Sequence, residues 1–171
     1  MPKRFDLLVF DWDGTLMDSA GAIVASIQAS CRDLGLPVPE HERAAHVIGL
    51  GLKDALAYAV PELAPSEYGK LAERYRHHYL ARDPDLELFP GMREMLVLLK
   101  DRGHVLAVAT GKTRIGLERV LEATQLKQVF NSSRCADETH SKPHPAMLQE
   151  LMQELLIEPE ATLMIGDTAH D

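Results

Sequence analysis

The chain has 171 residues, of which 46% are hydrophobic and 26% are charged, and its formal net charge is −8. This composition is typical of a globular protein that is long enough to bury a core, and it excludes a disordered chain. The acidic charge repels nucleic acids and anionic lipid surfaces, so we expect neither as a partner.

Cys31 and Cys135 are far apart in the sequence and form no disulfide framework, which is typical of a reducing compartment. Residues 1–6 contain basic side chains but no secretory signal pattern, and no apolar stretch approaches the roughly 20 residues of a membrane span. We therefore expect a cytoplasmic protein with no membrane partner.

The predicted elements begin with an apolar strand at residues 6–10. Residues 18–88 then show helical spacing and no strand pattern, so we expect a helical insert, with a return hinge at residues 83–85. Its helices are predicted at residues 20–27 after the capping pair Asp18-Ser19, at residues 52–60 and at residues 66–80.

Strands and helices alternate after the insert. Strands are predicted at residues 105–109, more weakly at 128–132, and at 162–165, with amphipathic helices between them. Near-continuous apolar strands are typical of parallel strands buried on both faces. The fold class is therefore α/β, with a Rossmann-like parallel sheet built from right-handed βαβ units and an inserted helical domain.

Polar residues that could take part in catalysis or ligand binding follow the predicted strands. Asp11 and Asp13 leave the first strand together, and two carboxylates this close repel each other unless a cation or a shared proton relieves them. Thr110 and Gly111 follow the second strand at the start of a helix, where a hydroxyl and free amides can bind an anion. Each motif alone also has an ordinary structural interpretation, as a polar turn after a strand.

Two further motifs complete the set. Lys142 stands just before a helix in the segment at residues 141–145, and a lysine is a point charge suited to a phosphoryl group. Asp167 and Asp171 follow the last strand, and such hard oxygen ligands suit magnesium. Because the carboxyl ends of parallel strands meet at one edge of a sheet, we expect these groups to converge.

In this order the segments FDWDGTLMDS, LAVATGK, SKPHPAML and MIGDTAHD resemble the haloacid dehalogenase superfamily, in its phosphoglycolate phosphatase-like subgroup with a helical cap. The resemblance covers nearly the whole chain. It implies a core of residues 1–17 and 89–171, with an α-helical cap of residues 18–88. Family members continue beyond the position of Asp171, so we expect the C-terminal part of the core to be missing from this sequence.

The resemblance also implies roles for these residues. Asp11 would be the nucleophile, and Asp13 would protonate the leaving oxygen and then activate water. Lys142 would offset the charge on the nucleophile and the phosphoryl group. Thr110 and Gly111 would bind phosphoryl oxygens. Magnesium would be held by Asp11, the backbone carbonyl of Asp13 and Asp167, with Asp171 supporting the metal or orienting Lys142.

The segment at residues 48–53 resembles the substrate-facing loop of the family's cap, and there Lys53 could meet an anionic group of the substrate. For the other residues considered as possible site residues, we prefer a structural role to a catalytic one. Trp12 should pack on the opposite side of the strand, and Cys31 should lie in the core. Lys112 and Arg114 could aid phosphate binding, but a solvated helix start is the preferred interpretation.

The expected function is magnesium-dependent hydrolysis of a small phosphomonoester, similar to phosphoglycolate, through an aspartyl-phosphate. The partner would be a small phosphorylated metabolite, and the sequence does not define the oligomeric state. The alternatives are a sugar phosphomutase or pyrophosphatase of the same superfamily, and a catalytically silent phosphate-binding regulator. A receiver-type signalling module is disfavoured by the insert and by the second acid, Asp13.

Overall fold

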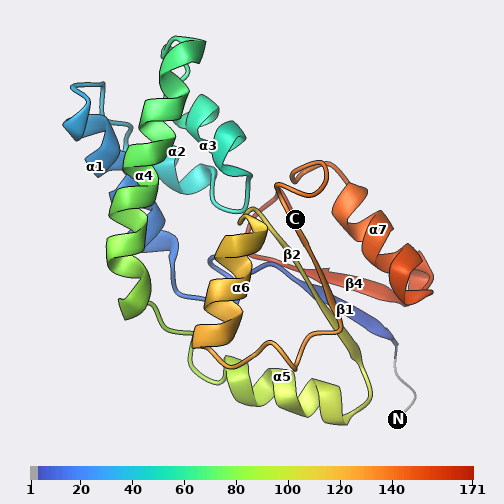
Figure 1. Ribbon diagram of the computed structural model, residues 1–171. Coiled ribbons are helices and arrows are strands. Elements are labelled where there is room, and N and C mark those ends of the chain that lie inside the picture. The colour runs from blue at the N-terminus through green and yellow to red at the C-terminus, as the bar shows by residue number, and fades with distance from the viewer. Residues whose placement is uncertain (1–3) are drawn as a thin grey trace.

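The computed structural model describes residues 4–171 (Figure 1). Residues 1–3 lie outside the described residues. Two predictions include them, namely the core that begins at residue 1 and the absence of a secretory signal in residues 1–6. Within the described range, every helix is too short or too polar to cross a lipid bilayer.

Four parallel strands form one sheet in the order β3-β2-β1-β4. The strands are β1 (Leu7–Phe10), β2 (Val105–Thr110), β3 (Ser132–Cys135) and β4 (Thr162–Ile165). The central strand β1 is in register with both neighbours, since its last residue Phe10 pairs with Val108 on one side and Ile165 on the other. The residues that follow β1, β2 and β4 therefore leave the sheet at one edge.

Helices cover both faces of the sheet. They are α5 (Met92–Asp101), α6 (Arg114–Ala123) and α7 (Ala146–Leu155). Leu8 and Phe10 of β1 pack in a cluster with residues of α5 and α6, whereas Leu7 and Val9 pack with residues of α7. Alternate side chains of a strand point to opposite faces, so the continuous apolar run of β1 serves both layers.

A second group of helices lies beyond the carboxyl ends of the strands (Figure 1). It contains α1 (Ala20–Asp33), α2 (His41–His46), α3 (Leu52–Ala59) and α4 (Tyr68–Arg82), and a 3₁₀ turn at Asp83–Asp85 leads back toward α5. These helices share a hydrophobic cluster of their own, in which Cys31 is buried as expected. The short helix α2 was not predicted.

The third strand differs from its prediction at residues 128–132, because the structure places it at Ser132–Cys135. The apolar Val129 and Phe130, which suggested a strand, instead pack against the core cluster under α5 and α6. The strand that does form lies at the edge of the sheet, and a half-exposed edge strand needs no continuous apolar pattern.

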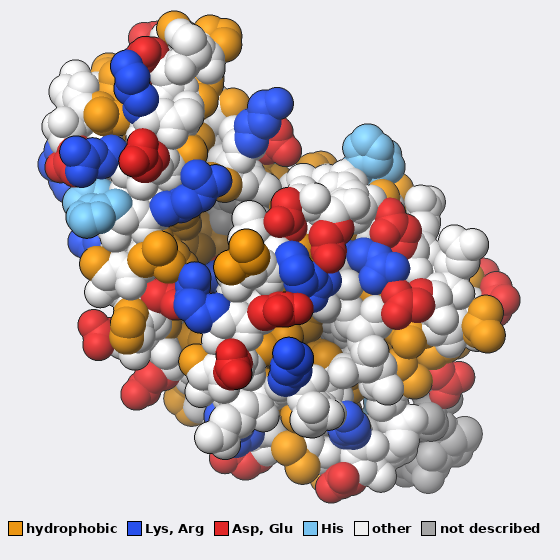
Figure 2. Space-filling model, viewed as in Figure 1, with side chains coloured by type: hydrophobic (Ala, Val, Ile, Leu, Met, Phe, Trp, Pro, Cys, Tyr) orange, Lys and Arg blue, Asp and Glu red, His pale blue; other side chains and the backbone are white. Residues whose placement is uncertain are grey.

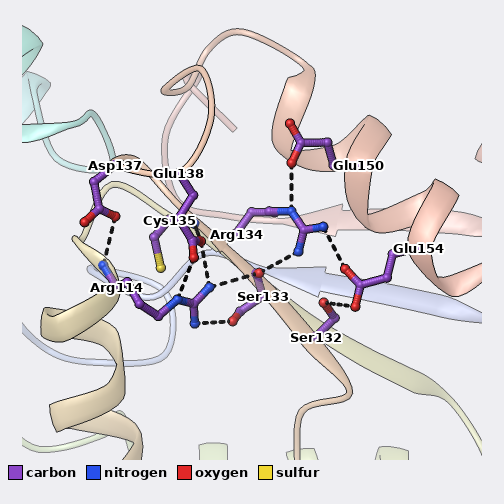
Figure 3. A network of polar contacts seen from close by, with 9 residues as sticks. All are labelled: Arg114, Ser132, Ser133, Arg134, Cys135, Asp137, Glu138, Glu150 and Glu154. Atoms are coloured by element: carbon purple, nitrogen blue, oxygen red, sulfur yellow. Dashed lines mark hydrogen bonds and ion pairs between the residues drawn. The ribbon is translucent and has the colours of Figure 1, made fainter.

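Polar contacts hold this edge strand (Figure 3). Arg134 forms ion pairs with Glu150 (2.8 Å) and Glu154 (2.7 Å), both on α7. On the other side, Arg114 of α6 pairs with Glu138 at 2.7 Å and donates to Ser133 Oγ at 2.7 Å. Arg114 was interpreted as solvated, and this was wrong, because these contacts occupy its guanidinium.

Candidate active site

Asp11 and Asp13 follow β1 directly, and both are buried. The chain turns sharply after them at Gly14, which has a φ of +83°. A Cβ built at Gly14 would overlap the carboxylate of Asp167, which follows β4. A glycine is therefore needed here for two reasons, the left-handed backbone and the close approach of the last loop.

Three carboxylates meet at this edge of the sheet. Oxygen atoms of Asp11, Asp167 and Asp171 all lie within 4.8 Å of one another. Thr15 Oγ1 donates to Asp167 Oδ1 at 3.0 Å, while the backbone N–H and the Oγ1 of Thr168 each donate to Asp171 Oδ2 at 3.1 Å. The sheet register thus brings together acids that are some 150 residues apart, as the sequence predicted.

Lys142 supplies the cationic side chain of this cluster. Its Nζ lies 2.7 Å from Asp11 Oδ1 and 2.6 Å from Asp171 Oδ1, and the side chain is only 5% exposed. Burial raises the pKa of Asp11 to about 7, and the neighbouring Lys142 ammonium opposes this rise. A single ammonium faces three carboxylates here, so the cluster has an excess of negative charge.

The donor set fits a divalent cation. Asp11 Oδ2 is buried and has no hydrogen-bond partner in residues 4–171. Buried polar atoms are normally paired, so an unpaired carboxylate oxygen beside two more carboxylates is an arrangement that a cation would complete. Oxygen ligands are those that magnesium prefers.

Asp13 has different partners from Asp11. Its Oδ1 accepts a hydrogen bond from Ser19 Oγ at 2.7 Å and lies 3.0 Å from Lys112 Nζ. Lys112 also donates to the Tyr79 hydroxyl of α4 at 2.9 Å. The two carboxylates of one motif are therefore held in separate environments, which is how two carboxyl groups acquire different chemical roles.

Two expectations about this network were wrong. Ser19 was expected to cap α1, but its side chain makes no capping hydrogen bond and bonds to Asp13 instead. Lys112 was interpreted as solvated, but its side chain is 9% exposed and paired with Asp13. In both cases a buried carboxylate supplies a stronger partner than the helix end or water does.

The loop between α2 and α3, residues 47–51, lies over the acid cluster. We call it the cap loop. A Cβ built at Gly49 would lie 3.5 Å from Lys142 Nζ and 3.7 Å from Asp11 Oδ2. Gly51 donates its backbone N–H to Ser141 Oγ at 2.7 Å. The loop thus shields Asp11, which is fully buried, from solvent.

Thr110 and Gly111 lie beneath the same loop. Thr110 is fully buried at the end of β2, and its Oγ1 accepts from the backbone N–H of Lys112 at 3.2 Å. A Cβ built at Gly111 would overlap the carbonyl oxygen of Leu50 and lie 2.6 Å from that of Gly49. A side chain at position 111 is therefore incompatible with the docked cap loop.

Replacing Gly111 by alanine is expected to push the cap loop away from the sheet. The hydrogen bond from Gly51 to Ser141 would then open more often, and amide hydrogen exchange at Gly51 should accelerate at least about tenfold. Gly69→Ala is the matched control, because nothing lies within 4 Å of a Cβ at that position. Unchanged exchange at Gly51 in the Gly111 variant would contradict the close docking of the loop.

The remaining candidates lie elsewhere. Lys53 is exposed in the first turn of α3, and the structure does not bring it to the acid cluster, so its role stays a prediction. Trp12 is fully buried in the core cluster and packs edge-on against Phe130, as expected. Ser19 and Tyr79 were missed as site residues, and Lys112 was considered only as an aid to phosphate binding. Only Ser19 and Lys112 carried a signal in the sequence, since both belong to segments that follow the strands.

Comparison with known proteins gives matches over most of the chain. The model of the family described as "Haloacid dehalogenase-like hydrolase" matches residues 8–171. The chain is 37% identical to "Probable phosphatase IndB" of Dickeya dadantii, with 96% of this chain and 74% of that protein covered. It is 30% identical to a phosphoglycolate phosphatase of Haemophilus influenzae, with 100% of this chain and 81% of that protein covered.

A solved structure has the same architecture. It is described as a predicted phosphoglycolate phosphatase from Haemophilus somnus, and it superimposes with a TM-score of 0.81 at 27% identity. The match covers 96% of this chain and 78% of that one. The chain thus spans about three quarters to four fifths of the length of these proteins.

Proposed function

We propose that this chain, which belongs to the haloacid dehalogenase-like hydrolase family, hydrolyses a small phosphomonoester through a phosphorylated aspartate, with magnesium as its cofactor. The observation that carries the proposal is the separation of the two neighbouring acids. Asp11 lies with Lys142, Asp167 and Asp171, whereas Asp13 lies apart with Ser19 and Lys112. Relatives named phosphatase support the reaction class.

Asp11 is the proposed nucleophile. One of its carboxylate oxygens attacks phosphorus, a new P–O bond forms, and the bond from phosphorus to the ester oxygen breaks. Asp13 gives a proton to that leaving oxygen, so the product is an alcohol. Water then attacks the phosphorus of the aspartyl-phosphate while Asp13 takes a proton from it. The bond from phosphorus to the Asp11 oxygen breaks, inorganic phosphate is released, and the Asp11 carboxylate is restored.

The other residues position charge. Lys142 Nζ, at 2.7 Å from Asp11 Oδ1, would also face the oxygens of a phosphoryl group bound at Asp11. Thr110 and the amide of Gly111 would bind further phosphoryl oxygens. Magnesium would be held by Asp11, Asp167 and the backbone carbonyl of Asp13, with Asp171 in support, and it would neutralise charge on the phosphoryl oxygens.

We further propose that residues 18–88 are a cap on a core of residues 1–17 and 89–171. The separate hydrophobic clusters of the two parts and the docking of the cap loop on Gly111 support this division. A docked cap excludes water from the phosphorylated aspartate until hydrolysis. The cytoplasmic location expected from the sequence remains a prediction.

The test is release of inorganic phosphate from p-nitrophenyl phosphate and from a panel of phosphorylated metabolites, with magnesium present. We expect multiple turnovers on at least one phosphomonoester. Turnover that requires a sugar bisphosphate activator would indicate a phosphomutase, and hydrolysis of pyrophosphate alone would indicate a pyrophosphatase. Binding of phosphate without turnover would contradict the proposal in favour of a silent regulator.

A further inference from the structure

A cavity of about 430 Å³ opens between the helical part and the sheet. Its inner end is formed by Asp13, Gly49 and Gly111, next to the acid cluster, and its outer walls come from α1, α3, α4 and α6. Figure 2 shows this recess between α4 and α6, with hydrophobic side chains in its walls. A cavity of this size accommodates a substantial organic group.

Apolar side chains form most of the walls beyond the inner end. They come from four helices and the cap loop, and they include Ile23, Val47, Leu52, Tyr75, Leu80 and Ile115. The rings of Tyr75 and Tyr79 stack with their centroids 5.7 Å apart, and both line the cavity. Burial raises the pKa of both phenols above the ordinary range, so they present neutral surfaces.

All but one of the charged side chains in the lining have an ion-pair or hydrogen-bond partner among residues 4–171. Lys112 is paired with Asp13 at 3.0 Å, and Arg119 is paired with Asp83 at 2.7 Å. Asp137 accepts the backbone N–H of Arg114 at 2.9 Å. Of the cationic lining residues, Arg76 alone has no ion pair within the described part of the chain, and it lies on the exposed side of α4.

This arrangement does not suit a small leaving group that carries a carboxylate. In phosphoglycolate the carboxylate is one carbon from the ester oxygen, so with Asp13 at that oxygen it would lie at the inner end. There the nearest ammonium, that of Lys112, is shared with Asp13 and the Tyr79 hydroxyl, and most of the walls farther out are apolar. A carboxylate transferred from water to such a place loses hydration and meets only an ammonium that already has two other partners.

We propose that the substrate is a phosphomonoester of an uncharged, predominantly apolar alcohol or phenol, whose organic part occupies this cavity. This inference rests on the proposed function and makes its substrate class specific. The ester oxygen lies at Asp13, and the organic part extends outward between α4 and α6. Relatives named for phosphoglycolate therefore share the chemistry of this chain but not its preferred substrate.

The test compares phosphomonoesters with one variable group. Phosphate release is measured for phosphoglycolate and for ethyl, butyl and hexyl phosphate. We expect kcat/KM to rise by about two- to fourfold per added methylene, as each methylene leaves water. Phosphoglycolate should be at least about tenfold poorer than ethyl phosphate. A flat alkyl series, or a preference for phosphoglycolate, would overturn the inference while leaving the phosphatase function intact.

A variant locates the effect in the cavity. Ile115 is 80% exposed on α6 at the cavity wall, so Ile115→Ser should not disturb folding. We expect it to lower kcat/KM for hexyl phosphate at least about threefold more than for ethyl phosphate. Leu98→Ser is the matched control, because Leu98 is exposed on α5 and does not line the cavity. Equal effects of the two variants would place the apolar preference elsewhere and overturn the assignment.

A binding measurement decides the question if no ester is hydrolysed. Calorimetry then compares hexylphosphonate, ethylphosphonate and phosphonoacetate, which cannot be cleaved at a P–O ester bond. Tighter binding of hexylphosphonate than of the other two supports the apolar cavity even though the proposed reaction has failed. Equal affinities, or a preference for phosphonoacetate, would contradict it.

Discussion

Replacing Asp11 by asparagine is expected to lower turnover of any phosphomonoester by at least about a thousandfold. The amide has nearly the same shape as the carboxylate, but its oxygen cannot attack phosphorus to form an acyl phosphate. The fold should survive, because Lys142 keeps its ion pair with Asp171 at 2.6 Å. The loss of a buried charge also removes a desolvation cost.

The measurement is phosphate release at saturating substrate, together with the thermal unfolding temperature of each protein. Asp101→Asn is the matched control, since this acid is exposed at the end of α5 and far in sequence from the cluster. We expect parental turnover in the control and a parental or higher unfolding temperature in the Asp11 variant. Turnover of that variant within tenfold of the parent would eliminate Asp11 as the nucleophile.

Removal of divalent cations is expected to stop turnover, and added magnesium should restore it. Because a cation that binds only the folded state stabilises it, magnesium should also raise the unfolding temperature. At a magnesium concentration a hundredfold above the dissociation constant, the free energy of unfolding increases by about 2.7 kcal/mol. For a chain of this size the unfolding temperature then rises by roughly 5–10 °C. Full turnover in excess chelator would contradict the cofactor assignment.

The thermal shift should depend on pH in a defined direction. Burial raises the pKa of Asp11 to about 7, so below pH 7 a proton increasingly occupies the carboxylate that the cation needs. The shift caused by magnesium should therefore be larger at pH 8 than at pH 6. The Asp167→Asn variant should lose most of the magnesium-induced rise in unfolding temperature at both pH values, while the Asp101→Asn variant should keep it.

Much of the fold was predictable from the sequence because it depends on local patterns. Apolar runs at residues 6–10, 105–109 and 162–165 marked β1, β2 and β4, and the structure contains these strands within one or two residues. The edge strand β3 was predicted a few residues too early. The sequence of β3 is polar, and ion pairs such as Arg134 with Glu150 hold this strand, so a hydrophobic pattern does not report its position.

The acid cluster was also predictable, for a topological reason. Carboxyl ends of neighbouring parallel strands meet at one edge, so residues that directly follow β1 and β4 must come close together. The oxygens of Asp11 and Asp167 within 4.8 Å agree with this rule. Lys53 was inferred from the loop pattern alone, and no strand end constrains its position.

The sequence by itself determined the order of the elements, the parallel sheet and the convergence of Asp11, Asp167 and Asp171, because each follows from short-range pattern or from strand topology. Only the tertiary structure decided that Asp13 pairs with Lys112 and that Lys112 contacts Tyr79. It also decided that the cavity beside them is apolar. These contacts join segments that are separate in the chain, namely the loops after β1 and β2 and the helix α4, and the packing of the helices of residues 20–82 against the sheet sets them.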